Sequence, residues 1–282
     1  YFISGNYFNQ QGIILNSYYK RLSFRANVET KIGKRVNLGL NLFANSLNSN
    51  DNGSDGNSGP VSRSTRVAPI VGLTQQTEAG GYYPFHAAFY LNPIALAKEI
   101  TNETNGKNIL ANIFTTINLA KNLSLRSSLG ANYTDAFVQY YLPNDINRGV
   151  GSNGRISSSY VENYLNENIL TYNIEKSSWN VNALAGFTYQ DSKTVSEFLD
   201  KGGFPDDEIR TLNMGTILNS GSSSATAWSL MSFLSRISTS WKNKYLLSAS
   251  IRRDGSSRFG ADNQWGWFPA LSVGWRIGQE TF

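Results

Sequence analysis

Apolar and polar side chains alternate along much of this 282-residue chain, and the clearest run covers residues 22–32. A period of two places successive side chains on opposite faces of a β-strand, so the run predicts a strand with one apolar and one polar face. Its length matches the ~9–11 residues that a strand needs to cross a bilayer and exceeds the ~5–6 of a globular strand. The apolar face of the run comprises Leu22, Phe24, Ala26, Val28, Thr30 and Ile32.

The same alternation recurs in about ten segments, and the connections between them are short and long in turn. Long connections are predicted at about 47–108 and 192–225, and one of medium length at about 135–155. Outer-membrane barrels have short periplasmic turns and long extracellular loops, whereas a soluble sandwich has no reason for this regularity. The pattern therefore predicts an all-β chain that forms a segment of an antiparallel transmembrane β-barrel. The tight turns are predicted at 33–35, 120–122, 175–178 and 242–244.

Aromatic residues are predicted at both ends of these strands. Transmembrane barrels carry aromatic girdles at the two membrane surfaces. Trp265 and Trp267 are predicted near the outer girdle. The alternative is that the aromatic residues form the core of a soluble β-sandwich that acts as a binding module. The residues predicted beside the tight turns, in the periplasmic girdle, are Trp179, Trp241, Tyr245 and Trp275.

The composition narrows the classes of function. No run approaches the ~20 apolar residues that a membrane-crossing helix needs, and the mean hydropathy is −0.33. The chain has no Cys, which excludes a disulfide scaffold and a cysteine metal site. Its net charge is +5, but Lys and Arg are scattered through short turns and form no stripe, so nucleic acid is not expected as a partner.

Two sequence stretches carry a resemblance to a known family. RRDGSSRFG at 252–260, followed by NQWGWFPALSVGWRI at 263–277, resembles the barrel hairpin of the SusC/RagA family of TonB-linked outer-membrane proteins. YFNQQGII at 7–14 resembles another barrel segment of that family. Weaker similarities lie at 92–95 and 185–190. The resemblance extends over nearly the whole chain and is most specific in its last forty residues.

The resemblance implies a function that the alternation alone does not give. It implies that residues 1–282 are part of a barrel of about 22 strands, wide enough to hold a plug domain that this chain does not contain. Members of the family import oligosaccharides or peptides across the outer membrane. They work with a SusD-like surface lipoprotein and draw energy from a TonB–ExbB–ExbD complex. We therefore expect an outer-membrane transporter, not an enzyme, that needs no cofactor and contacts outer-membrane lipid, and we expect the chain to be a piece of a longer protein.

Candidate catalytic and metal-binding residues are few. His86 is the only histidine and has no nucleophile motif near it, so we predict no catalytic residue. Asp51 to Gly59 lacks the twelfth-position Glu of a calcium loop, because Ser62 stands there, and it is interpreted as a flexible loop. The acidic run Asp206-Asp207-Glu208 is interpreted as a solvated loop. No metal site is predicted.

Two groups of residues are candidates for ligand contact. Aromatic side chains in the longest loop can stack on sugars or bind peptides, and these are Tyr82, Tyr83, Phe85, Phe89 and Tyr90. The family-like motif is interpreted as a structural network that holds its hairpin, with ligand contact as the alternative. The motif consists of Arg252, Arg253, Asp254, Gly255, Ser256, Ser257, Arg258, Phe259 and Gly260.

Two other architectures remain open at this point. An autonomous ten-stranded outer-membrane barrel, acting as a pore or a surface hydrolase, predicts that the sheet closes on itself. A soluble β-sandwich predicts that the apolar faces are buried between two sheets. The sequence does not identify the transported substrate, because the loops carry no readable ligand code.

Overall fold

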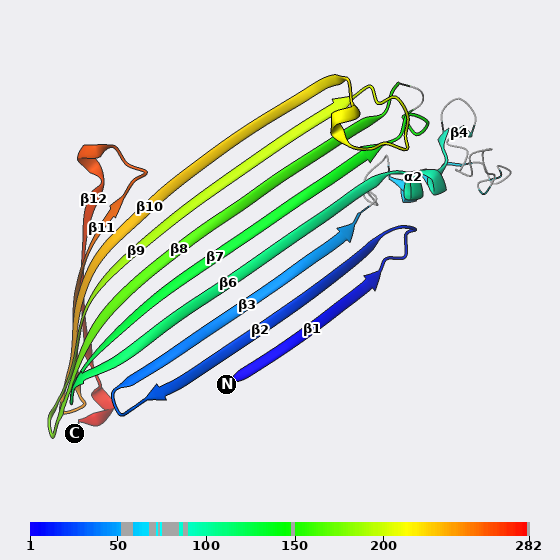
Figure 1. Ribbon diagram of the computed structural model, residues 1–282. Coiled ribbons are helices and arrows are strands. Elements are labelled where there is room, and N and C mark those ends of the chain that lie inside the picture. Colours follow the sequence, from blue (N-terminus) through cyan, green and yellow to red (C-terminus); the bar gives the residue numbers. More distant parts are fainter. Residues whose placement is uncertain are drawn as a thin grey trace.

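The computed structural model describes residues 1–51, 59–67, 72, 74, 85–86, 90–147 and 150–280. Its main feature is one antiparallel sheet of ten strands in which each strand pairs with its neighbours in the chain. The sheet is long and curved (Figure 1). Its strands are β1 (Phe2–Gln11), β2 (Tyr18–Ile32), β3 (Val36–Asn50), β6 (Thr101–Ala120), β7 (Leu123–Leu142), β8 (Asn153–Lys176), β9 (Trp179–Gly202), β10 (Ile217–Trp241), β11 (Tyr245–Ser256) and β12 (Trp265–Trp275).

The remaining elements are short. In the described ranges, no helix is long and apolar enough to cross a membrane. These elements are the helices α1 (Pro60–Ser64) and α2 (Pro93–Glu99), the strand pair β4 (Phe85–His86) and β5 (Tyr90–Leu91), and the 3₁₀ turns η1 (Leu212–Met214), η2 (Ala261–Asn263) and η3 (Ile277–Gln279).

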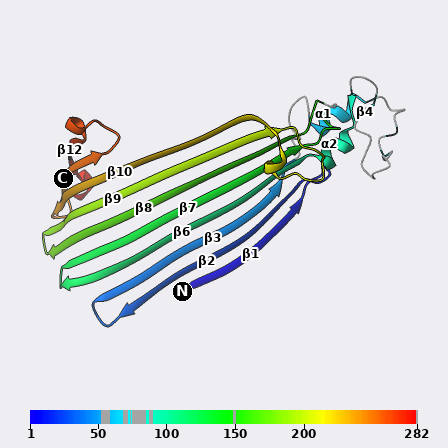
Figure 2. The ribbon, with the colours of Figure 1, turned by 45° about the horizontal axis from the view of Figure 1, so that its top comes forward.

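The two ends of the sheet differ. Tight turns join β2 to β3, β6 to β7, β8 to β9 and β10 to β11 at one end, which we call the turn end. The helices and the long connections lie at the opposite end, the loop end (Figure 2). Gly33, Lys242 and Asn243 have positive φ angles in two of the tight turns, as reversals of very few residues require. The predicted alternation of short and long connections is confirmed.

The sheet is open. Its order begins at β1 and ends at β12, and the described residues of these two strands do not pair with each other. The chain is therefore a segment of a barrel wall that does not close on itself, and the alternative of an autonomous ten-stranded barrel is wrong for it. The sandwich alternative is also wrong, because the sheet forms a single layer. Apolar side chains that a sandwich would cover, such as Leu129 and Val273, are 61% and 76% exposed.

Strand pairing carries the alternation across the whole sheet. Directly paired residues on antiparallel strands project to the same face. Leu40 of β3 pairs with Val28 and Ile113, whereas its neighbour Asn41 pairs with Asn27 and Asn112. One side of the sheet, the apolar face, is thus rich in Leu, Ile and Val, and the other, the polar face, is rich in Asn, Ser and Thr.

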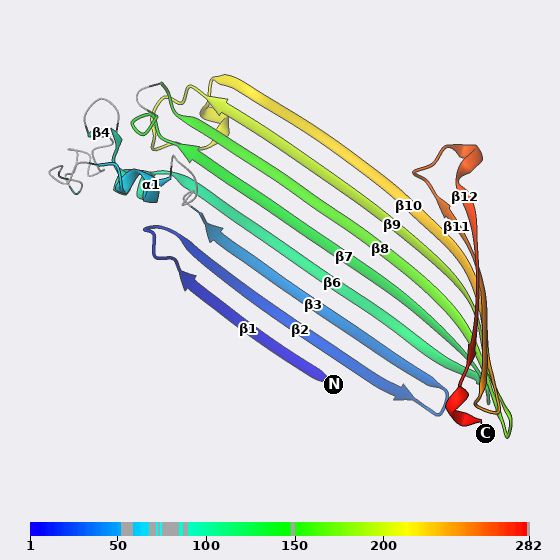
Figure 3. The same ribbon diagram turned by 180° about the vertical axis from the view of Figure 1, so that it is seen from behind.

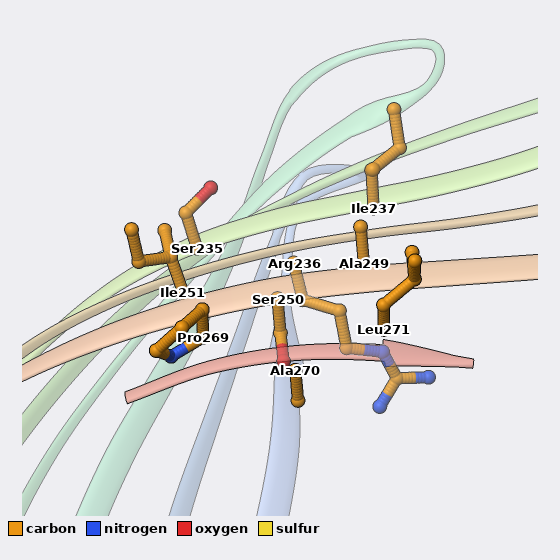
Figure 4. Close-up of a pocket in the computed structure, with 9 residues that line it drawn as sticks. All are labelled: Ser235, Arg236, Ile237, Ala249, Ser250, Ile251, Pro269, Ala270 and Leu271. Atoms are coloured by element: carbon orange, nitrogen blue, oxygen red, sulfur yellow. The ribbon is translucent and has the colours of Figure 1, made fainter. Parts of the chain in front are cut away.

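The same alternation is visible at the β10–β12 edge of the sheet. In Figure 4, Ile237 and Ile251 extend to one side of the ribbon, and Arg236 and Ser250 extend to the other. These residues belong to a shallow pocket at this edge. Because a closed barrel in a bilayer turns its apolar face to lipid, the polar face lines the lumen.

The strands are longer than the sequence predicts, so the predicted loops were too wide. The connection predicted at about 47–108 covers only 51–100, and the one predicted at about 192–225 covers only 203–216. The predicted connection at about 135–155 covers 143–152. The loop-end halves of β3, β6 and β10 are rich in Ser, Thr and Asn on both faces. Backbone pairing continues there after the apolar alternation has ended.

A close approach between two strands explains one glycine of the polar face. The ring of Phe114 on β6 covers Gly39 on β3, and a Cβ at Gly39 would lie 2.1 Å from Cζ of that ring. The Arg126 guanidinium also lies over this ring, with Cζ 3.9 Å from the ring centroid. The ring is therefore in contact with both the β3 backbone and an arginine.

Gly39→Ala is expected to destabilise the folded protein by about 1–3 kcal/mol, because the added methyl group overpacks against Phe114. Gly5→Ala on β1 is the matched control, since a Cβ there meets nothing within 4 Å. Denaturant unfolding in detergent micelles measures both variants. Equal stability of the two variants would contradict the packing described here.

Candidate functional site

An aromatic girdle lies at the turn end of the apolar face. Trp241 pairs with Trp179 on β9 and with Tyr245 on β11, and Tyr245 pairs with Trp275 on β12. Ring centroids are 6.0 Å apart for Trp179 and Trp241, and 5.4 Å apart for Trp241 and Tyr245. The predicted girdle beside the tight turns is confirmed by this row of contacts.

The opposite end of the apolar face carries a second aromatic group. Trp265 and Trp267 of β12 lie on either side of Arg253, whose Cζ is 4.7 Å and 5.3 Å from the two ring centroids. Trp265 also covers Gly255, where a Cβ would lie 2.8 Å from the indole. An arginine stacked between two tryptophans suits a membrane surface, where the charge reaches water and the rings reach lipid.

The polar face is suited to hydrogen bonding along a water-filled path. Its Asn and Ser side chains bond across neighbouring strands. Asn108 donates to Thr134 Oγ1 at 2.7 Å across β6 and β7, and the Ser238 and Ser248 hydroxyls bond at 2.9 Å across β10 and β11. No group of three or more His, Cys, Asp or Glu residues in the described ranges is placed to hold a metal ion.

The family-like motif holds its own hairpin together. The Arg252 guanidinium forms an ion pair of 2.6 Å with Asp254 and donates to Ser232 Oγ, a fully buried side chain on β10. Ser257 caps the neighbouring strand, since its backbone N–H donates to the Ser229 carbonyl and its hydroxyl accepts from the Ser229 N–H. These local bonds agree with the interpretation that the motif is a structural network that holds its hairpin. That interpretation stays a prediction.

The rest of the motif lies in the turn between β11 and β12. The Arg258 backbone N–H donates to Ser256 Oγ, and the Arg258 guanidinium lies over the Trp228 ring at 5.0 Å. Phe259 is 61% exposed and Gly260 precedes η2. The Phe259 ring is therefore exposed on a turn that Ser257 and Arg258 hold against β10.

The aromatic ligand candidates cannot be placed as side chains. Tyr82, Tyr83 and Phe89 lie outside the described residues. Phe85 and Tyr90 belong to the β4–β5 pair, and their side chains lie outside the described part of the structure. Their role in ligand contact stays a prediction, and the His86 side chain also lies outside the described part.

Asp200 forms a polar network that the sequence did not reveal. Its carboxylate accepts hydrogen bonds from Asn153 and Asn219 at 2.6 Å and 2.8 Å, and forms an ion pair with Arg155 at 3.1 Å. The side chain is only 8% exposed. Burial alone would raise the pKa of Asp200, but the bonds from Asn219, Asn153 and Arg155 together hold it below its usual value of 3.8. The network ties β8, β9 and β10 together beyond the membrane-spanning part.

The Asp200 network is expected to weaken in acid. A carboxyl whose pKa is lowered by folding stabilises the fold above its unfolded pKa, and this stabilisation is lost as the pH falls through the folded pKa. The protection of amides in the loop-end halves of β8 and β9, measured relative to the intrinsic exchange rate at each pH, should therefore fall below pH 3.8. Asp200→Asn should show low protection already at neutral pH and little further loss of protection in acid. An acid response that survives in Asp200→Asn would contradict this assignment.

A second network fastens the 203–216 connection. Asp207 accepts from the Tyr141 hydroxyl at 2.9 Å and from the Asn144 backbone N–H at 3.0 Å. Arg210 donates to the Glu99 carbonyl and to Thr101 Oγ1, and its guanidinium stacks on the Tyr141 ring at 5.0 Å. Burial raises the pKa of Tyr141 to about 12, and the bond to Asp207 acts in the same direction, so the phenol stays a donor.

This network corrects the interpretation of the acidic run. Asp206 accepts from the backbone N–H groups of Glu208 and Ile209, and Asp207 reaches across to β7, so the run is a fastened turn and not a freely solvated loop. The network lies beside a small core of Ala95, Leu96 and Ile146, which joins α2 to the connection between β7 and β8. Sequence spacing gave no sign of these contacts, because they join residues about 65 or more positions apart.

Comparisons with known proteins show where this sheet belongs. No family model matches the chain. It aligns over its full length with TonB-dependent receptor P3 of Formosa agariphila, at 30% identity over 294 residues, and covers 29% of that receptor. TonB-dependent receptor SusC of Bacteroides thetaiotaomicron is 48% identical over 58 residues, which are 21% of this chain and 6% of SusC. The RagAB peptide transporter superposes with a TM-score of 0.80 at 20% identity, over 99% of this chain and 33% of that chain.

The chain is a barrel segment of a SusC/RagA-type TonB-dependent receptor. It spans less than a third of the length of the curated relatives it matches. The open sheet agrees with this, since a wall segment of a larger barrel has two edges that other strands complete. In such a receptor the turn end of the sheet faces the periplasm and the loop end faces the cell exterior.

Proposed function

We propose that the receptor containing this segment takes up oligosaccharides or peptides across the outer membrane by TonB-dependent transport. A SusD-like surface lipoprotein assists it on the cell exterior, and the TonB–ExbB–ExbD complex supplies energy through parts of the protein outside this segment. The observation that carries the proposal is the alignment of the whole sheet with TonB-dependent receptor P3, together with the match of 58 residues to TonB-dependent receptor SusC.

The geometry of the segment supports this proposal. The polar face offers Asn, Ser and Thr side chains along the full height of the wall, which suits a wide and hydrated path for a polar solute. The receptor's own role in the path is to enclose it and to keep lipid out. The proposal assigns it no catalytic residue and no cofactor.

Ligand contact is proposed for the aromatic residues of the longest connection. Tyr82, Tyr83, Phe85, Phe89 and Tyr90 fall within the 51–100 connection, at the loop end. Aromatic faces stack on sugar rings and their polar tips bond to peptides. An exterior position would let these residues meet cargo before it enters the barrel.

The experiment is growth of a strain that lacks the receptor gene. We expect it to lose growth on one class of oligomer, glycan or peptide, while it still grows on the corresponding monomers. A strain that lacks TonB should show the same loss. Replacing Tyr82 and Tyr83 by Ala should lower oligomer binding and leave the amount of folded receptor unchanged. Undiminished growth of the receptor-deletion strain on every oligomer tested would contradict the proposal.

A further inference from the structure

The exterior half of β10 has one unpaired edge. β10 pairs with β9 from Ile217 to Trp241, but β11 accompanies it only from Leu230 to Trp241. Among the described residues, none pairs with the other side of β10 between Ile217 and Thr226. Figure 3 shows the short β11–β12 hairpin beside a β10 that continues far beyond it. The barrel wall is therefore incomplete on the exterior side of this hairpin, and we call the open space beside Ile217 to Thr226 of β10 the notch.

Two hydrogen bonds of the β10 strand, one at its turn end and one just below the notch, show which of its backbone groups point into the notch. The Lys242 N–H donates to Ser178 beside β9, so even-numbered residues of β10 face β9. The Ser229 carbonyl accepts from Ser257 beside β11, so odd-numbered residues face the opposite side. The register stays unbroken from Ser229 to Ser220. The N–H and C=O groups that point into the notch are therefore those of Gly221, Ser223, Ala225 and Ala227.

This edge lacks the features that normally protect an edge strand. Proteins block exposed edges with charged residues, Pro, bulges or a covering segment. Residues 220–227 have the sequence SGSSSATA, with no charged residue and no Pro. The one bulge in the pairing of β10 with β9 lies before this stretch, between Leu218 and Ser220. Every residue from Ile217 to Ala227 is exposed. The edge lies outside the membrane. Ala227 pairs with Lys193 on the apolar face, and a charged residue on that face indicates that the strand has already left the lipid at this level.

We propose that this edge binds an extended strand of a partner protein on the cell exterior, by β-strand addition. Outward N–H and C=O groups that recur every second residue match an extended backbone and no other common ligand. The small, uncharged side chains let that backbone approach closely, and they impose little selectivity on the amino-acid sequence of the partner strand. The proposal goes beyond uptake and does not depend on the cargo.

Geometry favours a partner strand over a molecule in transit. Hydrogen bonds at a strand edge lie in the plane of the sheet, so the occupant continues the wall sideways. Cargo that moves along the polar face would lie against that face. The chain's own β11 cannot extend to fill the notch, because Ser257 caps Ser229 and the chain turns away there.

Photo-crosslinking of the full-length receptor in intact cells tests the proposal. A benzophenone amino acid is placed at Ser224, next to the edge. The matched control is Ser159 of β8, which lies on the same rung and the same face through Ser196, two strands from the edge. We expect Ser224 to attach to another polypeptide and Ser159 to do so much less. Moving the probe from Ser224 to Ser222 should move the attachment point by two residues on the partner.

Edge variants show whether backbone bonding is responsible. Ala225→Pro removes one outward N–H and is expected to lower the cross-link yield from Ser224 roughly tenfold, whereas Ala225→Ser keeps the N–H and should retain the yield. Receptor assembly is checked by its heat-modifiable mobility in gels. The proposal fails if Ser224 attaches only to its own chain or to a second copy, if it attaches to nothing, if Ala225→Pro in an assembled receptor does not lower the yield, or if the attachment point does not follow the probe.

Discussion

Leu40→Arg is expected to destabilise the receptor in a bilayer by about 2–4 kcal/mol, the cost of placing an arginine on the lipid face near the membrane midplane. Leu40 lies in the middle of the apolar stretch of β3 that begins at Val36, and it pairs with Val28 and Ile113, so its side chain projects from the apolar face. Unfolding in lipid vesicles measures the effect. The penalty should shrink in detergent micelles, which adapt to a charge more readily than a bilayer does.

The adjacent residue provides the control for Leu40→Arg. Asn41 is exposed on the polar face and pairs with Asn27 and Asn112, with no charged residue directly opposite. Asn41→Arg should change the free energy of unfolding by less than about 0.5 kcal/mol, as an ordinary surface substitution does. Equal penalties for the two neighbours would show that the two faces of β3 do not differ in environment.

Asp207→Ala is expected to loosen the 203–216 connection by about 1–3 kcal/mol. The substitution leaves the Asn144 N–H without its acceptor and the buried Tyr141 hydroxyl with only its longer bond, 3.4 Å, to the Asp206 carbonyl, and buried polar groups that lose partners carry this cost. Arg210 would lose the fixed backbone that directs it toward Thr101. Faster hydrogen exchange and earlier proteolytic cleavage within 203–216 measure the change.

Asp206→Ala separates this effect from a general loss of charge. Asp206 accepts only from Glu208 and Ile209 among the bonds recorded for its side chain, and these lie within its own turn. Its removal should therefore affect exchange much less than Asp207→Ala. A larger effect at Asp206 than at Asp207 would contradict the assignment of Asp207 as the residue that fastens the connection.

The membrane-crossing part of the sheet was predictable from the sequence because lipid imposes a simple rule there. Alternate residues must be apolar where one face of a strand meets lipid, and this rule identified 22–32 as part of β2 with its faces correctly divided. It also placed Trp241 beside the tight turn that follows it. The family resemblance supplied what the alternation does not contain, namely the size of the complete barrel and the class of transport.

The exterior part was not predictable, because water imposes no such rule. Residues 220–227 of β10 are small and polar on both faces, so they resemble a loop in sequence although they pair with β9 throughout. The pairs Asp200–Arg155 and Asp207–Tyr141 join distant residues at spacings that have no local signature. Both predicted long loops were too wide for this reason.

The central claim is that this sheet is a wall segment whose apolar face meets lipid and whose polar face meets water. Single cysteines at residues 36–44 of β3, other than Gly39, can each carry a spin label in a full-length receptor from which every other Cys has been removed. Collision rates with oxygen, which concentrates in lipid, and with a water-soluble nickel complex measure the environment of each label. The account predicts that labels at Val36, Leu38, Leu40, Leu42 and Ala44 favour oxygen and that labels at Asn37, Asn41 and Phe43 favour nickel. Accessibility without a period of two would contradict it.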